Sequence, residues 1–329
     1  MSDILFRVGL VGCGLIGTKR ALNLPSCASV THLFDTNPQQ ADALARKLKY
    51  EVTISPSVNS LLRSDDIDVV FVATTHVNLP LIAKAAIEAK KHVLIEKPGA
   101  NSLEALQELQ KLARLNNVEV HVGFNHRFHP SVLKAKELID SGKFGKLLWL
   151  RARYGHGGRT GYEHEWRAQK SISGGGELID QGSHLIDLTR FLVGDVSLAF
   201  SELQTSFWDM EVEDNAFIAL RPNQGGLAWL HASWTEWKNT FSLEIAMSTA
   251  KLDLVGLGGS YGPEQLTLFV MQPEMGPPPA EVFSWSTEDN SWSLEIEDFF
   301  SALAKRPSRG ASIEDAIQVH ILMKEIYSQ

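Results

Sequence analysis

The sequence predicts an α/β protein: a doubly wound parallel sheet at the N-terminus, followed by an α+β domain with a large open antiparallel sheet. Three observations predict this fold. A glycine-rich turn joins an apolar strand to a helix near the start of the chain. Strand and helix patterns then alternate with short connections up to about residue 123. From residue 147, strand patterns follow one another through short turns, which indicates antiparallel pairing.

The composition narrows the class of protein before any motif is considered. The chain has 329 residues, enough for two domains, which we place at residues 1–123 and 124–329. Hydrophobic residues make up 44% and charged residues 21%, which excludes an intrinsically disordered chain, and no apolar run is long enough to cross a bilayer. The net charge of −8 disfavours nucleic-acid or membrane-surface partners. Two cysteines and the lack of a leader pattern predict a cytoplasmic location.

The first strand pattern ends in the stretch FRVGLVGCGLIG, which contains a G-x-G-x-x-G motif. Gly12 permits a tight turn, Gly14 lets the backbone approach a pyrophosphate, and Gly17 lets the helix pack on the strand. The helix start at Leu15 and Ile16 offers N–H groups to the phosphates. The motif therefore predicts a Rossmann domain that binds a dinucleotide.

The second strand, Ser29–Phe34, is followed by Asp35 and Thr36. An acidic residue at this point accepts both hydroxyls of an adenosine ribose and repels a 2′-phosphate, so we expect NAD as the cofactor rather than NADP. The alternative is that Asp35 only begins the turn before the next helix. Cys13 is interpreted as a small filler of the glycine turn, because no histidine partner is evident.

Polar residues also follow the later strands of this domain. Ligands bind beyond the carboxyl ends of parallel strands, so these residues are expected at one crevice. They are Thr74, Thr75 and His76 after strand 68–73, Glu96 and Lys97 after strand 92–95, and Asn125 and Arg127 after strand 118–122. Helices are expected at 79–89 and along a leucine stripe from Leu103 to Leu112.

The second half is expected to form one sheet with few helices over it. Its strands are predicted at 147–154, 197–208, 214–221, 226–237, 240–248 and 251–255, and its helices near 176–192, 294–304 and 313–327, with a proline-rich loop at 272–280. A large sheet with a bare face favours a homo-oligomer, a dimer or tetramer, formed through that sheet.

The helix near 176–192 places Asp180, His184 and Asp187 on one stripe of an otherwise apolar helix. Such polar side chains need a partner or a ligand. One interpretation is a structural Asp–His pair that joins two elements. A metal site is disfavoured, because no second histidine lies four residues from His184 and no further His/Cys cluster frames it.

Three motifs together resemble the Gfo/Idh/MocA oxidoreductases. They are Glu96-Lys97-Pro98, Gly175-Gly176 followed by Asp180-x-Gly182-x-His184-x-x-Asp187, and Gly123-Phe124-Asn125-x-Arg127-Phe128-x-Pro130. The resemblance covers essentially the whole chain. The sequence departs from the Thr-Pro-Asn turn of many members, because Thr74-Thr75-His76 stands there, which puts a substrate role of His76 in doubt.

The resemblance implies NAD(P)-dependent oxidation of a secondary alcohol, with Lys97, Asp180 and His184 as the catalytic set. Either Lys97 or His184 could take the hydroxyl proton. We favour His184, oriented by Asp180, with Lys97 either polarising the same oxygen or relaying its proton. Glu96 is expected to contact the cofactor or Lys97, and Pro98 to fix the turn, with a cis bond as an option that the sequence leaves open.

The stretch 151–170 contains five basic and two acidic side chains with interleaved aromatics, which suggests an anionic substrate, although a solvated loop explains the charges too. The predicted substrate contacts are Arg127, Tyr154, Arg159, Tyr162, Trp166, Arg167, Asp180 and His184. Within the family, this stretch resembles members that oxidise C3 of UDP-N-acetylglucosamine in lipid A or surface-polysaccharide biosynthesis.

Three alternatives to this nucleotide-sugar substrate stay open. The first is a dehydrogenase of a free sugar or cyclitol. The second is a glycosidase of the same fold that keeps NAD bound, and the third is a dinucleotide-binding regulator without turnover. An acid–base set at Lys97, Asp180 and His184 argues against the regulator.

Overall fold

The computed structural model describes residues 6–286 and 288–329, which form two compact units. The first unit runs to Asn125 and includes Trp292–Gln318; the second comprises His126–Ser291 and Val319–Gln329. The predicted boundary at residue 123 lies close to the observed one. The prediction that everything after it belongs to the second domain is wrong for Trp292–Gln318, because this segment packs in the core of the first unit.

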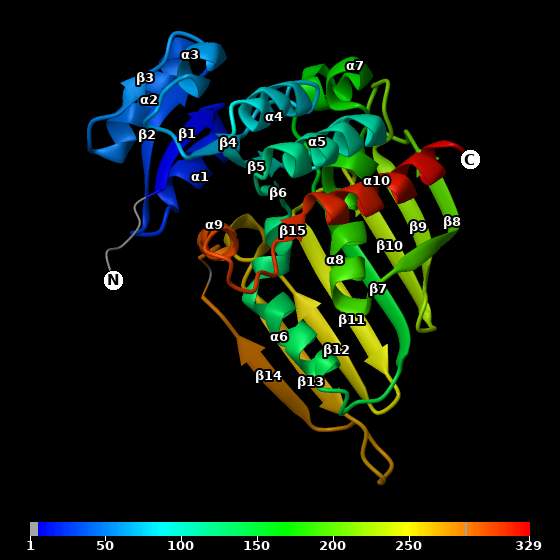
Figure 1. Cartoon of the computed structure of the whole chain (residues 1–329). Helices are drawn as coiled ribbons and strands as arrows, with labels where there is room; N and C mark the ends of the chain where they lie inside the picture. Colours follow the sequence, from blue (N-terminus) through cyan, green and yellow to red (C-terminus); the bar gives the residue numbers. More distant parts are fainter. Residues whose placement is uncertain (1–5, 287) are drawn as a thin grey trace. The chain divides into compact units, whose positions relative to one another are not determined.

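The first unit is built on a sheet of seven strands among the described residues, in the order β15-β6-β5-β4-β1-β2-β3 (Figure 1). These strands are β1 (Phe6–Val11), β2 (Ala28–Phe34), β3 (Thr53–Ile54), β4 (Val69–Val72), β5 (His92–Glu96), β6 (Val120–Gly123) and β15 (Ala311–Ser312). All neighbours pair in parallel except β15, which runs antiparallel to β6. The chain leaves β1 toward β2 and β3, and later returns to β4 on the other side of β1. The sheet therefore has a switch point between β1 and β4.

Helices connect these strands as the sequence predicts for β-α-β units. They are α1 (Leu15–Leu22), α2 (Pro38–Leu48), α3 (Val58–Leu62), α4 (Leu79–Glu88), α5 (Leu103–Asn116) and the C-terminal helices α9 (Ser291–Leu303) and α10 (Ile313–Tyr327). Side chains of Asn37, Ser57 and Ser102 accept backbone N–H bonds at the starts of α2, α3 and α5. Strand β4, VVFV, is buried throughout, which is typical of a parallel strand covered on both faces.

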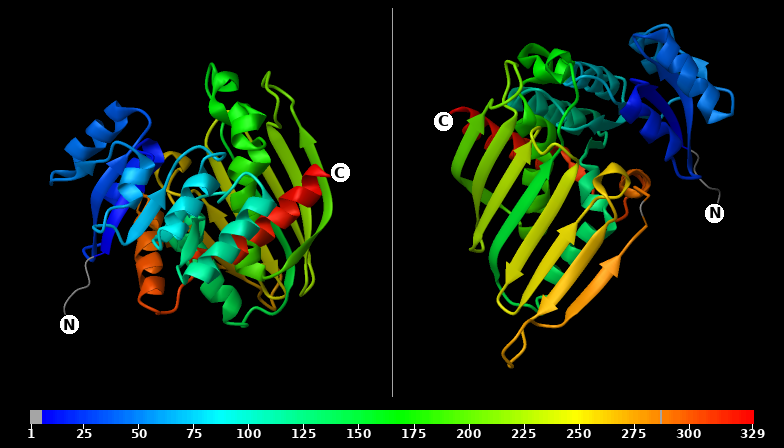
Figure 2. Two further views of the ribbon diagram at one scale, coloured as in Figure 1. Left: turned by 45° about the horizontal axis from the view of Figure 1, so that its top comes forward. Right: turned by 180° about the vertical axis from the view of Figure 1, so that it is seen from behind.

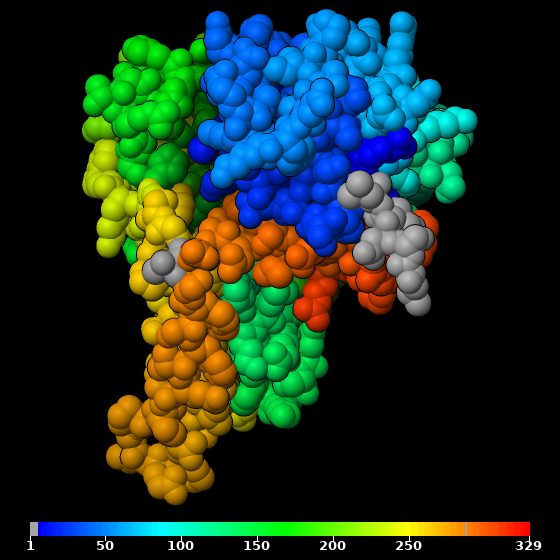
Figure 3. All heavy atoms as spheres, turned by 90° about the vertical axis from the view of Figure 1, so that its left-hand side faces the viewer, coloured from blue at the N-terminus to red at the C-terminus, as the bar shows by residue number. Residues whose placement is uncertain are grey.

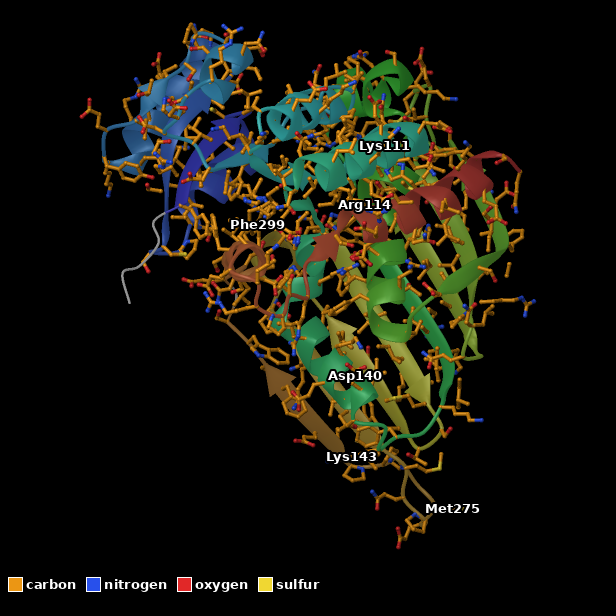
Figure 4. All side chains as sticks on the ribbon, viewed as in Figure 1. Lys111, Arg114, Asp140, Lys143, Met275 and Phe299 are labelled. Atoms are coloured by element: carbon orange, nitrogen blue, oxygen red, sulfur yellow. The ribbon has the colours of Figure 1, made fainter. Side chains whose placement is uncertain are left out.

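The return of α9 to the first unit rests on aromatic packing. The ring of Phe299 lies 6.1 Å from that of Phe71 on β4, and the ring of Phe300 lies 5.0 Å from that of Phe6 on β1. Figure 3 shows the orange residues of α9 against the blue N-terminal residues, and Figure 4 labels Phe299. Sequence patterns show that α9 is apolar but not which distant sheet its apolar side chains cover.

The second unit is built on a sheet of eight strands among the described residues, in the order β14-β13-β12-β11-β7-β10-β9-β8. They are β7 (Leu147–Gly155), β8 (Val196–Gln204), β9 (Asn215–Pro222), β10 (Leu227–Ser233), β11 (Thr240–Met247), β12 (Ala250–Val255), β13 (Gln265–Val270) and β14 (Ala280–Ser284). All pairs are antiparallel except β7 with β10, which is parallel. The sequence patterns missed β13 and β14. The predicted proline-rich loop joins them, with Met275 exposed at its tip (Figure 4).

One face of this sheet carries α6 (Pro130–Asp140) and α8 (Ser183–Val193) (Figure 1). Its other face is bare along the described part of the second unit (Figure 2, right). The alternating exposure of β10, from Leu227 to Ser233, follows from this one-sided burial. In the residues that the structure describes, no helix combines the length and apolarity needed to span a membrane.

Candidate functional site

The predicted cofactor residues lie at the carboxyl ends of five neighbouring strands of the first unit. They are Gly12, Gly14, Leu15, Ile16 and Gly17 after β1, Asp35 and Thr36 after β2, Thr74, Thr75 and His76 after β4, Glu96 and Lys97 at the end of β5, and Asn125 after β6. The parallel sheet therefore brings all of these positions to one edge, on both sides of its switch point.

The glycine turn leaves an open cradle at the start of α1. A Cβ atom added to Gly12, whose φ is 95°, would lie 2.2 Å from the carbonyl oxygen of Ala73, and one added to Gly17 would lie 1.8 Å from that of Gly12. A Cβ atom added to Gly14 would meet nothing within 4 Å. Gly14 is also the N-cap residue of α1, so no side chain caps this helix start, and the first turn of α1 contains no acidic residue. Unused N–H groups beside a small open space are what a pyrophosphate requires, so these residues fit NAD.

Asp35 binds the glycine turn as well as its own loop. Its carboxylate accepts the Cys13 N–H at 2.7 Å and the Asn37 N–H at 2.8 Å. The anion therefore lies beside the phosphate cradle, where it would repel a 2′-phosphate. Burial, with a smaller contribution from Asp35, raises the pKa of the Cys13 thiol to about 12, which agrees with its interpretation as a filler.

Glu96 has a buried partner that the sequence did not predict. The side chain of Arg20 on α1 donates to Glu96 Oε1 at 2.6 Å and also to Glu295 on α9. Burial alone would lower the pKa of Arg20, but Glu295 and Glu96 outweigh it and raise that pKa. A Cβ atom on Gly123 would come within 2.4 Å of Arg20 Nη2, so the glycine makes room for this ion pair. Glu96 thus anchors the end of β5, and its contact with the cofactor or Lys97 stays a prediction.

Lys97 follows this anchored residue directly. Its peptide bond to Pro98 is cis, the option left open by the sequence. The Lys97 side chain is half-buried, and it belongs to the first unit, whereas Asp180 and His184 belong to the second. The predicted catalytic set is thus divided between the two units, and each part is described within its own unit.

The helix of the second unit begins with a π-helical turn, η4 (Leu178–Gly182), which carries Asp180 and leads into α8. The buried carboxylate of Glu213 accepts the N–H groups of Gly176 and Leu178, each at 3.0 Å, and the hydroxyl of Tyr327 at 2.7 Å. Glu213 therefore fixes the glycine turn from which the helix starts. π-turns are frequent at functional sites, and this one replaces the start of the regular helix that the sequence predicted.

Asp180 forms an ion pair with Arg167 at 3.3 Å from Nε to Oδ2. The guanidinium of Arg167 also lies 4.6 Å from the ring of the neighbouring Trp166. Burial alone would lower the pKa of Arg167, but the charge of Asp180 outweighs it and the pKa is raised. The structure thus brings together three predicted residues, Asp180, Trp166 and Arg167.

His184 lies in a cluster of rings one turn further along. Its centroid is 3.8 Å from that of His126 and 6.2 Å from that of Tyr154 on β7. Burial, followed by the charge interaction and hydrogen bond with Tyr261, raises the pKa of Tyr154, and burial raises the pKa of Tyr261 to about 12. Both phenols are therefore neutral hydrogen-bonding groups, and Tyr154, predicted as a substrate contact, lies in the ring cluster of His184.

Sequence reasoning missed His156, which follows β7. Its Nδ1 accepts the N–H of Gly158 at 2.9 Å, so Nε2 carries the proton of the neutral ring. Burial lowers the pKa of His156, against the opposing charge of Asp180. A neutral imidazole N–H donor beside a carboxylate is suited to bind a sugar hydroxyl. His156 comes near Asp180 because the chain reverses direction after β7, and no local sequence pattern predicts this reversal.

Two predicted substrate contacts are buried structural residues instead. Arg127 on η1 (Asn125–Phe128) donates to both carboxylate oxygens of Asp187, at 2.8 and 2.6 Å, and both side chains are at most 5% exposed. Tyr162 packs in a hydrophobic cluster with Trp234 and is 4% exposed. Arg159 differs: it is largely exposed and pairs with Glu165. Because Arg127 binds both carboxylate oxygens of Asp187, Asp187 is not available as a metal ligand beside Asp180 and His184.

The first unit has a glycine cradle at the switch point of a parallel sheet, which is the arrangement of a dinucleotide-binding Rossmann domain. Residues 6–124 match the family model described as the oxidoreductase family with an NAD-binding Rossmann fold, and residues 132–253 match the GFO/IDH/MocA C-terminal domain. The chain belongs to the Gfo/Idh/MocA family. The family match confirms the predicted fold class and the prediction of NAD as cofactor.

Similar proteins include dehydrogenases of sugars and cyclitols. Levoglucosan dehydrogenase of Pseudarthrobacter phenanthrenivorans is 32% identical over 232 residues, which are 67% of this chain and 59% of that protein. An inositol 2-dehydrogenase/D-chiro-inositol 3-dehydrogenase of Lacticaseibacillus casei is 23% identical over 95% of this chain and 88% of that protein. A solved structure of levoglucosan dehydrogenase in complex with NADH and levoglucosan has a TM-score of 0.88 and 26% identity, and the match covers 98% of this chain and 96% of that chain.

Proposed function

We propose that the protein oxidises a secondary alcohol of an uncharged sugar or cyclitol, with NAD as hydride acceptor. The observation that carries the proposal is the pairing of every arginine of the 151–170 stretch with an acid. The partners are Glu244 for Arg151, Glu236 for Arg153, Glu165 for Arg159, and Asp180 and Glu165 for Arg167. A diphosphate would have to displace these acids, whereas hydroxyl groups hydrogen-bond to the same pairs without displacing them.

The relatives that act on levoglucosan and inositol support the same choice. The nucleotide-sugar substrate, C3 of UDP-N-acetylglucosamine in lipid A or surface-polysaccharide biosynthesis, stays a prediction that the paired arginines disfavour. The free-sugar alternative is the one we adopt.

Oxidation of an alcohol to a ketone requires removal of a hydride from carbon and of a proton from oxygen. NAD, when bound, supplies the hydride acceptor at the nicotinamide ring. We assign the proton to His184, because its ring lies among the rings of His126 and Tyr154 and Asp180 lies one turn away, where it would stabilise the imidazolium. Lys97 is assigned to polarise the same oxygen. His156 and Tyr261 are assigned to further hydroxyl groups of the substrate.

The test is an absorbance assay for NADH with NAD and a panel of levoglucosan, myo-inositol and UDP-N-acetylglucosamine. We expect turnover with an uncharged substrate. Turnover with UDP-N-acetylglucosamine alone would refute the argument from the paired arginines. Release of free sugar without net NADH would favour the glycosidase, and tight NAD binding without any turnover would favour the regulator.

Lys97→Ala is expected to lower kcat at least 100-fold, the usual contribution of a positioned acid–base group, and to leave the Kd for NAD within about twofold. Lys111→Ala is the matched control, because Lys111 is an exposed lysine on α5 of the same unit (Figure 4). Wild-type kcat in Lys97→Ala would remove Lys97 from the catalytic set.

We also propose that the bare face of the large sheet binds a second copy of the chain. This face carries the half-exposed Trp149 and Trp229, which line a shallow hollow, and the half-exposed Phe200, whose ring stacks beside that of Trp229. Arg151 and Glu244 pair among them, so the same patch contains both signs of charge and is complementary to itself in a two-fold dimer. Trp229→Glu is expected to produce monomers in light scattering, and an unchanged oligomer mass would refute this surface.

A further inference from the structure

Three histidines of the second unit gather at the start of α8. His126 lies on η1, His129 follows η1, and His184 lies in the first turn of α8. Their side chains are nearly buried, with exposures of 6%, 2% and 5%. The ring of His126 lies 3.8 Å from that of His184, with the planes 40° apart, and 5.4 Å from that of His129. The rings of His126 and His184 are therefore in close contact in a tilted arrangement.

Buried ion pairs hold the two rings in this arrangement. Arg127, next to His126, binds Asp187, which lies three residues after His184 on α8. On the other side, Glu264 accepts from His129 Nδ1 at 3.1 Å and from the Ser131 N–H at 2.6 Å. Because the backbone on both sides of His126 is anchored, its ring has a fixed place over His184.

We propose that His126 is a positioning residue for the proton transfer assigned to His184: it fixes the plane of that ring and allows the stacked pair to hold only one proton. This inference rests on the proposed function. Two imidazolium rings in contact within a buried cluster would repel each other strongly, so protonation of either ring disfavours protonation of the other. The titration steps then belong to the pair rather than to one residue.

The charges around the pair favour one proton and reject a second. The titratable and charged groups on the packed elements include Arg127 and His129 near η1, Tyr154 on β7, Glu177, Asp180 and Asp187 along the segment from the start of η4 through α8, and Tyr261 and Glu264 before β13. Arg127 is matched by Asp187, and His129 by Glu264. The remaining acids are Asp180, which pairs with Arg167, and the buried Glu177.

Oxidation of an alcohol to a ketone removes a hydride from carbon and a proton from oxygen; bound NAD would supply the hydride acceptor, and His184 would take the proton and become an imidazolium. The single proton that the pair accommodates is the one taken from the substrate. If the neighbouring His126 ring already carried a proton, transfer of the substrate proton to His184 would be disfavoured. The coupling therefore makes turnover sensitive to the protonation of His126 as well as of His184.

The experiment is an NMR titration of the histidine Cε1–H signals in the NAD-free protein, with His126→Phe as the variant that keeps a ring but removes its titration. In the wild type, we expect the His184 signal to show two inflections, shared with His126. In His126→Phe, we expect a single inflection. His231→Phe is the matched control, because His231 stacks on Phe217 at 4.2 Å on the bare sheet face, and it should leave the His184 curve unchanged.

Kinetics give the second readout. His126→Asn, which removes the ring, is expected to lower kcat about tenfold with unchanged KM for sugar, and His126→Phe to recover most of this loss. Identical single-step His184 titrations in wild type and His126→Phe would overturn the inference. A wild type that shows the coupling but reduces no NAD with any sugar would instead refute the proposed function, so the two failures are distinguishable.

Discussion

Replacing Arg127 tests whether its role is structural or substrate binding. The guanidinium forms two hydrogen bonds to Asp187 in a place where the two side chains are 5% and 1% exposed. Arg127→Met removes the charge that compensates the buried Asp187 carboxylate. Breaking a buried pair from one side costs about 3–5 kcal/mol. For a folding unit of this size, that corresponds to a Tm lower by about 10 °C.

The double variant Arg127→Met/Asp187→Leu provides the decisive comparison. Removing both charges leaves no uncompensated ion, so we expect the double variant to regain at least about 2 kcal/mol relative to Arg127→Met in urea unfolding. Its KM for the sugar should remain near that of the wild type. If Arg127→Met keeps the wild-type free energy of unfolding but raises KM tenfold or more, Arg127 contacts substrate and the reasoning from burial is wrong.

Three further predictions concern the cofactor turn and the acid stability. Gly14→Ala should fold normally, because its Cβ position is open, yet weaken NAD binding in calorimetry; Gly17→Ala should lose NAD binding together with stability, since its Cβ would meet the Gly12 carbonyl. Equal behaviour of the two variants would contradict this. Asp35→Ala should raise the NAD concentration required with little change in kcat, and a wild type that uses NADP equally well would refute the ribose argument. Burial alone would raise the pKa of Glu264, but hydrogen bonds from His129 and Ser131 lower it below its usual 4.5. The ionised Glu264 therefore stabilises the fold above that pH, and this stabilisation is lost on further acidification. Glu264→Gln should make the free energy of unfolding in urea fall less steeply between pH 7 and pH 3. An unchanged dependence of that free energy on pH would exclude Glu264 as its cause.

The local patterns of the first unit were sufficient to predict the cofactor edge. Gly12, Gly17 and Asp35 stand where the sequence placed them, because the turn and the strand ends depend on neighbours in sequence. A parallel sheet then brings successive strand ends to one edge by its topology alone. The helix with Asp180 and His184 was predictable for the same reason, apart from its π-helical start.

Partners that lie far apart in the chain were decided only by the tertiary structure. Glu96 meets Arg20 and Arg127 meets Asp187 across 76 and 60 residues. Arg20 also meets Glu295 across 275 residues, so the same packing that returns α9 to the first unit turns Glu96 inward. The sequence shows which side chains carry charge, but whether a cation faces solvent, substrate or a buried acid depends on the partner that folding brings to it, and no local pattern encodes that partner.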